Sequence, residues 1–206
     1  MDVDHAARQL SAVWALAFSR DPEDWTGRLD RSLESVFRSF WAIAFSAPFV
    51  VMALIAWRRT AAASPQIDAT ALMAAPLPLQ LAIESVVYLA DWGVSVAAIV
   101  LFARALDVSR HAADAIIAYN WTQVFAAVFQ SIPVAIAALG GATALVGVFA
   151  LPAIAVSLMI LWAVFRRALT LTPGMTLALI IVMILITIIV GGALREGATV
   201  LFQASL

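Results

Sequence analysis

Two acidic residues, Glu84 and Asp91, lie inside one of the long apolar stretches of this chain, between Leu77 and Leu106. Carboxyl groups in such a stretch can carry protons or bind cations, and they are costly at membrane depth unless they are paired, wetted or neutralised. With three polar neighbours they recur at steps of four, four, three and four residues, which places all five on one helix face. This polar stripe consists of Gln80, Glu84, Tyr88, Asp91 and Ser95.

The next apolar stretch carries amide side chains that can face the polar stripe: Asn120, Gln123 and Gln130. The short connection 107–114 makes the two stretches antiparallel, and equal lengths counted back from it place Asp91 between Gln123 and Gln130 in depth. Three interpretations are open: a hydrogen bond from a neutral Asp91 to one of these amides, a path for protons or a solute, and a contact with a partner subunit. We favour the hydrogen bond, because polar side chains commonly bond across helices in membranes.

Residue types needed for catalysis or metal binding are scarce. The chain has no cysteine, and its two histidines, His5 and His111, stand in no metal-binding spacing. It contains no nucleophile elbow and no phosphate-binding glycine loop. A net charge of −1 without a basic tract argues against nucleic-acid binding. We therefore expect no catalytic residue, cofactor, metal or nucleic-acid partner, and we expect that the protein is not an enzyme.

The elements that must position the polar stripe are membrane-spanning helices. Apolar residues make up 64% of the chain and charged residues 12%, against about 45–50% and about 25% in soluble domains. A transmembrane helix needs about 20 mostly apolar residues, and five segments qualify. In an alternative, the third and fourth segments form a buried hairpin at Gly140-Gly141 that does not fully cross, but each is long enough to cross. We predict an all-α polytopic membrane bundle with spans at Phe40–Trp57, Leu79–Phe102, Ala115–Leu139, Ala142–Val164 and Met175–Ala193.

The distribution of arginine predicts the orientation, because cytoplasmic loops carry an excess of Lys and Arg. With the N-terminus inside, all arginines except Arg58, Arg59 and Arg195 fall on the cytoplasmic side. The lack of lysine and the abundance of alanine and valine are typical of a GC-rich bacterial coding sequence. We expect a multi-pass protein of the bacterial inner (plasma) membrane, with a cytoplasmic N-terminus and a periplasmic C-terminus.

Residues 1–38 are expected to form a cytoplasmic amphipathic segment ahead of a five-helix transmembrane domain, residues 39–206. The acidic run at 21–24 is typical of a helix start. Apolar residues then recur at helical spacing, which predicts one amphipathic helix that lies on the inner membrane face and leads into the first span. Its apolar residues are Trp25, Leu29, Leu33, Val36, Phe37 and Phe40, and Leu10, Trp14 and Phe18 repeat the pattern in a shorter helix before it.

Five spans, a cytosolic amphipathic lead and the triplet Tyr119-Asn120-Trp121 together resemble the YIP family of Rab-GTPase-interacting membrane proteins. The lead-in DRSLESVFRSFW, at 30–41, is also similar to that of bacterial relatives, and the aspartate-leucine-tyrosine-glycine-proline motif of eukaryotic members is absent. The resemblance implies a non-catalytic protein that organises or accompanies other membrane components. It carries no functional residue across.

These observations predict a non-enzymatic membrane protein that acts as a scaffold or as an accessory subunit of a membrane complex. Its expected partners are the lipid bilayer and either another membrane protein or a second copy of the chain. The alternative is a small proton-coupled carrier that uses the polar path on the second span. The lack of an obvious internal repeat disfavours the carrier, because many transporters are built from repeats.

Overall fold

The computed structural model describes residues 3–21, 25, 29–63, 75–140 and 143–204, and these residues form helices and no strand. The all-α class is therefore confirmed. Five of the described helices are longer than 20 residues, and three shorter ones precede or connect them. The helices are α1 (Val3–Phe18), α3 (Leu33–Ser39), α4 (Ala42–Ala63), α6 (Leu77–Ala105), the 3-10 turn η1 (Ser109–His111), α7 (Ala112–Gly140), α8 (Thr143–Ala168) and α9 (Pro173–Ala204).

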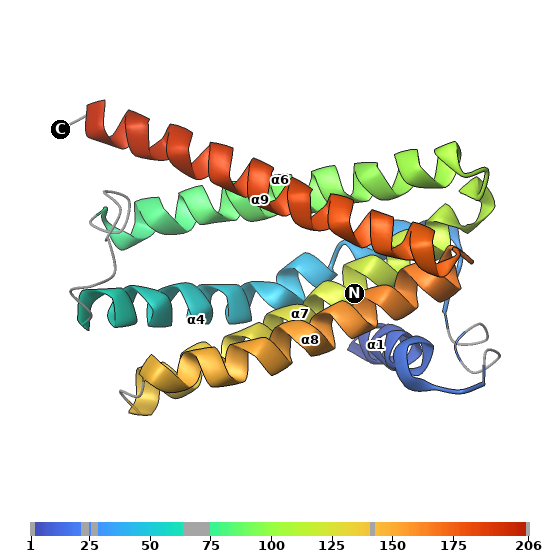
Figure 1. The fold of residues 1–206 in the computed structure, drawn as a ribbon, viewed down its shortest axis with the longest axis horizontal. Coiled ribbons are helices and arrows are strands. Elements are labelled where there is room, and N and C mark those ends of the chain that lie inside the picture. The colour runs from blue at the N-terminus through green and yellow to red at the C-terminus, as the bar shows by residue number, and fades with distance from the viewer. Residues whose placement is uncertain (1–2, 22–24, 26–28, 64–74, 141–142, 205–206) are drawn as a thin grey trace.

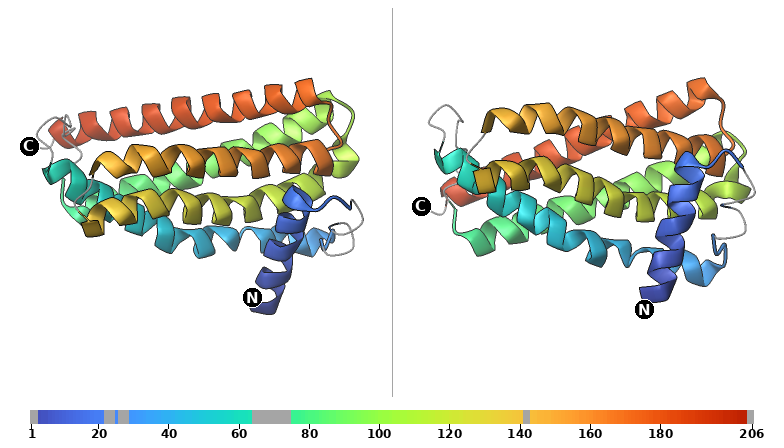
Figure 2. Two further views of the ribbon diagram at one scale, coloured as in Figure 1. Left: turned by 60° about the horizontal axis from the view of Figure 1, so that its bottom comes forward. Right: turned by 90° about the horizontal axis from the view of Figure 1, so that it is seen from below.

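The long helices run side by side in alternating directions and form two groups (Figure 1). Helix α7 packs against α4 and α8, whereas α6 packs mainly on α9, which crosses it obliquely. Helix α1 lies across α7 and α8 at one end of the bundle, far from the C-terminus (Figure 2). We call these two ends the α1 end and the C-terminal end. The hydrophobic core is concentrated toward the α1 end, where α1, α7 and α8 meet.

Four helices are long and apolar enough to cross a membrane, which indicates a multi-pass membrane protein. They are α4 together with the preceding α3, α6, α8 and α9. Helix α7, which carries Asn120, Gln123 and Gln130, is not among the four found within the described residues. Large apolar side chains on the outer faces of the four helices are exposed, as lipid contact requires; Leu101, Leu151, Met159 and Ile189 are examples.

The prediction of one continuous amphipathic helix before the first span is wrong. Residues 29–32 are not helical, and α3 begins only at Leu33. The cause is local: Asp30 Oδ1 accepts from the Ser32 amide at 3.0 Å, and Ser32 Oγ accepts from the Ser35 amide at 3.1 Å. Such side-chain bonds compete with helix continuation and then cap a new helix. The bond from the Ser32 amide also lowers the pKa of Asp30.

The break separates the predicted apolar stripe into two environments. Trp25 and Leu29 are buried, with exposed fractions of 6% and 5%, whereas Leu33 and Phe37 are 74% and 69% exposed. The first pair packs into the core of the bundle, and the second pair faces outward. The residues 22–24 and 26–28 of the predicted helix lie outside the described part of the chain.

The shorter helix predicted around Leu10, Trp14 and Phe18 is present as α1, but these residues are not its buried face. The buried side chains include Gln9 and Leu16, and Trp14 and Phe18 stay about half exposed. The end of α1 is held by α8, because Arg167 Nη1 donates to the carbonyl oxygens of Leu16 at 2.6 Å and Ser19 at 2.8 Å. The N-terminal segment therefore shares the core of the helix bundle.

Candidate functional site

A partly open cavity of about 500 Å³ lies between the two groups of helices. Helices α4, α6, α7, α8 and α9 all contribute to its wall. Six of the eight residues of the predicted polar cluster line it, and Gln80 and Asn120 do not. The polar lining residues are Glu84, Tyr88, Asp91 and Ser95 of α6, Tyr119, Gln123, Gln130 and Ser131 of α7, and Thr187 and Arg195 of α9.

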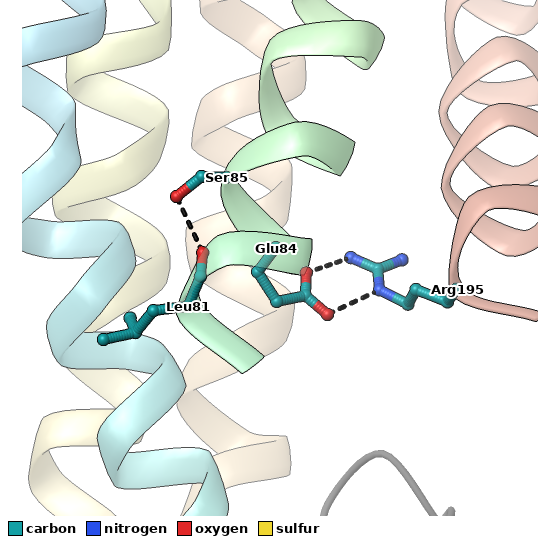
Figure 3. Close-up of polar contacts among 4 residues, drawn as sticks. All are labelled: Leu81, Glu84, Ser85 and Arg195. Carbon is teal, nitrogen blue, oxygen red and sulfur yellow. Dashed lines mark hydrogen bonds and ion pairs between the residues drawn. The ribbon is translucent and has the colours of Figure 1, made fainter. Parts of the chain in front are cut away.

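An ion pair joins α6 to α9 in the part of the cavity nearer the C-terminal end (Figure 3). Arg195 donates from Nε to Glu84 Oε1 at 2.9 Å and from Nη2 to Glu84 Oε2 at 2.8 Å. This two-bond geometry is the strong form of an arginine–carboxylate contact. The Arg195 side chain is half exposed and Glu84 is mostly covered, so the pair lies at the cavity rim rather than in its depth.

Arg195 was not among the predicted site residues, because the last span was predicted to end at Ala193. Helix α9 continues to Ala204, so Arg195 is helical and lies one turn after Gly191. A Cβ atom on Gly191 would lie 3.0 Å from Arg195 Nη1, so the missing side chain leaves room for the guanidinium beside the helix. The sequence signal that could have indicated Arg195 is Glu84 itself, because a carboxylate within an apolar span needs a cationic partner on another span.

Asp91 lies on α6 two helical turns closer to the α1 end than Glu84, a distance of about 10 Å along the helix axis. Its carboxylate interacts with Thr187 of α9. Its Oδ1 atom is buried and has no hydrogen-bond partner in the part of the chain that the structure describes. A buried polar atom of this kind usually has a partner, either in the protein or in solvent. Asp91 is thus the one charged group in the cavity lining that is left incompletely bonded.

The predicted hydrogen bond from Asp91 to Gln123 or Gln130 is not found among the described residues. Asp91, Gln123 and Gln130 do line one cavity, as their similar predicted depths indicate. The predicted partner helix of Asp91 was wrong, because α6 packs along α9 rather than α7. Gln123 instead interacts with the Tyr119 hydroxyl, which also contacts Ser95.

Two contacts from α6 fix the deeper wall of the cavity. The Tyr88 hydroxyl and Ser46 Oγ of α4 are 2.7 Å apart and hydrogen-bonded. The Ser46 hydroxyl also bonds the Ala42 carbonyl of its own helix. The contact of Ser95 with Tyr119 ties α6 to α7 about two turns further toward the α1 end. These bonds hold three helices around the cavity, while its middle remains open.

The two predicted cluster residues outside the cavity have other contacts. Gln80 Oε1 accepts from Arg58 Nη1 at 3.0 Å, which links α6 to the end of α4. Asn120 is fully buried; it accepts from Trp92 Nε1 and donates to Ser39 Oγ, both at 2.7 Å. Asn120 therefore joins α3, α6 and α7 through a satisfied buried network, and its role in the structure is to hold these helices together.

No group of three or more His, Cys, Asp or Glu residues in the described ranges is placed to hold a metal ion. Comparisons of this chain with protein-family models, curated proteins and solved structures find no match.

Proposed function

We propose that this protein is a small proton-coupled carrier of a bacterial inner membrane that binds a polar solute in the cavity around Asp91. The observation that carries the proposal is that Asp91, which has one buried carboxylate oxygen without a partner, lines a cavity of about 500 Å³. This volume is within the range of small-molecule sites, about 300–1,000 Å³. Ionisable groups at such depth are expensive and are typical of solute or proton pathways.

The arrangement of the helices is compatible with this role. One wall of the cavity belongs to the α6–α9 pair and the other to the α4–α7–α8 group, so a change in the angle between the groups changes access to Asp91. The Glu84–Arg195 pair holds α6 and α9 together as a unit. We propose a cytoplasmic N-terminus and five crossings, with α7 as the polar span inside the bundle.

The lack of native cysteine allows a direct test by thiol labelling. Ala127 lines the cavity on α7, whereas Leu185 on α9 is exposed on the outer surface and lines no part of that cavity. A carrier predicts that a membrane-impermeant maleimide labels Ala127→Cys in both right-side-out and inside-out vesicles. Leu185→Cys should be labelled in neither, because it faces lipid.

Two results contradict the proposal in different ways. Labelling of Ala127→Cys from one side only means a pocket without transport. Labelling from neither side means that no water-filled cavity exists around Asp91, and the binding function is then lost as well.

A second candidate, an accessory subunit of a membrane complex, is favoured by an apolar groove between α4 and α7. Small residues, Ala44, Ala47 and Ala135, line it beside Pro48. Small side chains let a partner helix approach closely, and this role is also what the YIP-like features imply. Gentle-detergent purification tests it: a stoichiometric partner that cross-links through Ala47→Cys supports this candidate, and a chain that purifies alone contradicts it.

A further inference from the structure

The charges that line the cavity do not cancel, and this bears on the solute that it takes. The charged lining residues are Glu84, Asp91 and Arg195. Glu84 and Arg195 are bonded to each other twice and together present no net charge. Asp91 takes part in none of the ion pairs found among the described residues. One carboxyl group that makes no ion pair, and that Arg195 influences only at longer range, is therefore left in the cavity.

The groups near Asp91 suit a donor with several N–H bonds. Gln123 and Gln130 each carry an amide oxygen, and the Tyr88 and Tyr119 hydroxyls accept as well as donate. An ammonium group has three N–H donors and no acceptor, so it complements a carboxylate surrounded by such oxygens. An anion would meet no free cation here, because the Arg195 guanidinium is already bound to Glu84.

The remaining wall is apolar and belongs to other helices. Phe49 of α4, Leu161 of α8 and Met183 of α9 lie around the same cavity. A bare metal ion would leave most of a space of about 500 Å³ unfilled. A molecule with one charged end and a hydrocarbon body fills both parts, because small-molecule sites are mostly apolar with a few placed polar groups.

We propose that the solute is a small organic cation, an amine whose ammonium group pairs with the Asp91 carboxylate and whose apolar body contacts Phe49, Leu161 and Met183. This inference rests on the proposed carrier function and specifies its solute. A proton and an ammonium group compete for the same carboxylate, so each amine that binds displaces a proton from a protonated Asp91. Movement of the amine across the membrane in one direction is thereby coupled to movement of a proton in the opposite direction.

Calorimetric titration of the purified full chain with three probes that share one apolar body tests this inference. The probes are phenethylamine, phenethyl alcohol and hydrocinnamate, which share a phenyl-ethyl body and differ in the charge of the head group. At neutral pH we expect phenethylamine to bind at least about tenfold more tightly than either of the others, as expected for one charge-assisted contact. This comparison needs no variant, so it stands even where a substitution impairs folding.

Variants then locate the site. Asp91→Asn should lower phenethylamine affinity by at least about tenfold, because the amide keeps the shape but not the charge. Asp107→Asn is the matched control: it removes the same charge from a turn outside the cavity, at a position with φ of 56° that asparagine tolerates. Its affinity should equal that of the unchanged chain.

Equal or tighter binding of the alcohol or the acid overturns the inference, and so does unchanged affinity in Asp91→Asn. Absence of binding by all three probes also overturns it. In each of these cases the labelling of Ala127→Cys from both sides decides separately whether the carrier function survives.

Discussion

Asp91 and Asn120 both have buried polar atoms, and the protein bonds these atoms in opposite ways. Asn120 makes two hydrogen bonds of 2.7 Å, whereas Asp91 leaves Oδ1 without a partner among the described residues. An unsatisfied buried polar group costs about 1–3 kcal/mol. This difference predicts that leucine has unlike effects at the two positions.

Asn120→Leu should lower the stability by about 1–3 kcal/mol, because it leaves the Trp92 indole N–H unpaired. Asp91→Leu should cost less stability than Asn120→Leu, because it removes an oxygen that is already unpaired together with a single bond to Thr187. Thermal unfolding of both variants in the same detergent measures the contrast. A loss of stability in Asp91→Leu as large as that in Asn120→Leu would show that Asp91 makes a further interhelical bond besides that to Thr187.

Gly191 and Gly192 allow a matched test of the ion pair at the cavity rim. Alanine in a helix interior is favoured over glycine by roughly 0.5–1 kcal/mol. At Gly192 a Cβ meets nothing within 4 Å, so Gly192→Ala should show this gain. At Gly191 the Cβ lies 3.0 Å from Arg195 Nη1, so the guanidinium that binds Glu84 must shift by a few tenths of an ångström and the gain should be smaller. Equal melting temperatures for the two variants would mean that the pair adds nothing to stability.

At the scale of elements, the docking of α1 depends on one side chain of α8. Arg167 bonds the last carbonyl oxygens of α1 at Leu16 and Ser19, which have no partner within the helix itself. Arg167→Gln should therefore increase hydrogen exchange along α1 in nanodiscs without changing exchange in α9. Arg104→Gln removes the same charge from an exposed position at the end of α6 and should leave α1 protected. Equal exchange in both variants would contradict the anchoring role.

The start of α7 predicts a pH dependence. Burial raises the pKa of Asp114 above 3.8, and Arg31, at 3.3 Å, and His111 oppose part of this rise. The native chain then binds this proton more tightly than the unfolded chain, so stability falls as pH rises from the ordinary value through the raised native pKa. Arg31→Gln should steepen this fall. The loss of unfolding free energy in Arg31→Gln, relative to the unchanged chain, should grow between acidic and neutral pH. This growth should be at most about 1 kcal/mol, because Arg31 is half exposed. A deficit that is the same at every pH would contradict this.

Helix positions were largely predictable, and helix neighbours were not. Long apolar runs predict α4, α6, α7, α8 and α9, because backbone groups in lipid must bond within their own segment. The stripe on α6 also places Glu84, Tyr88, Asp91 and Ser95 in one cavity. Spacing along one helix contains no information about which helix lies opposite, so the α9 partners Thr187 and Arg195 were missed. The break at 29–32 depends on competing side-chain bonds, which apolar periodicity does not register.

At the scale of the whole molecule, α1 and the C-terminus lie at opposite ends of the bundle. If α7 crosses the bilayer with the other four long helices, the two termini are on opposite sides. A periplasmic phosphatase fused after Ala204 should be active, and the same reporter fused at Asp107, in the turn at the α1 end, should be inactive. A silent reporter at Ala204 would mean that α7 does not cross.

Helix α9 is longer than the membrane that it crosses. Its 32 residues extend about 48 Å, and the hydrocarbon core of a bilayer is about 30 Å thick. A helix with such an excess tilts, and its tilt decreases as the bilayer thickens. Because Glu84 belongs to α6 and Arg195 to α9, the angle between these helices sets whether the two side chains meet. We therefore expect the acyl-chain length of the surrounding lipid to change the Glu84–Arg195 contact at the rim of the cavity.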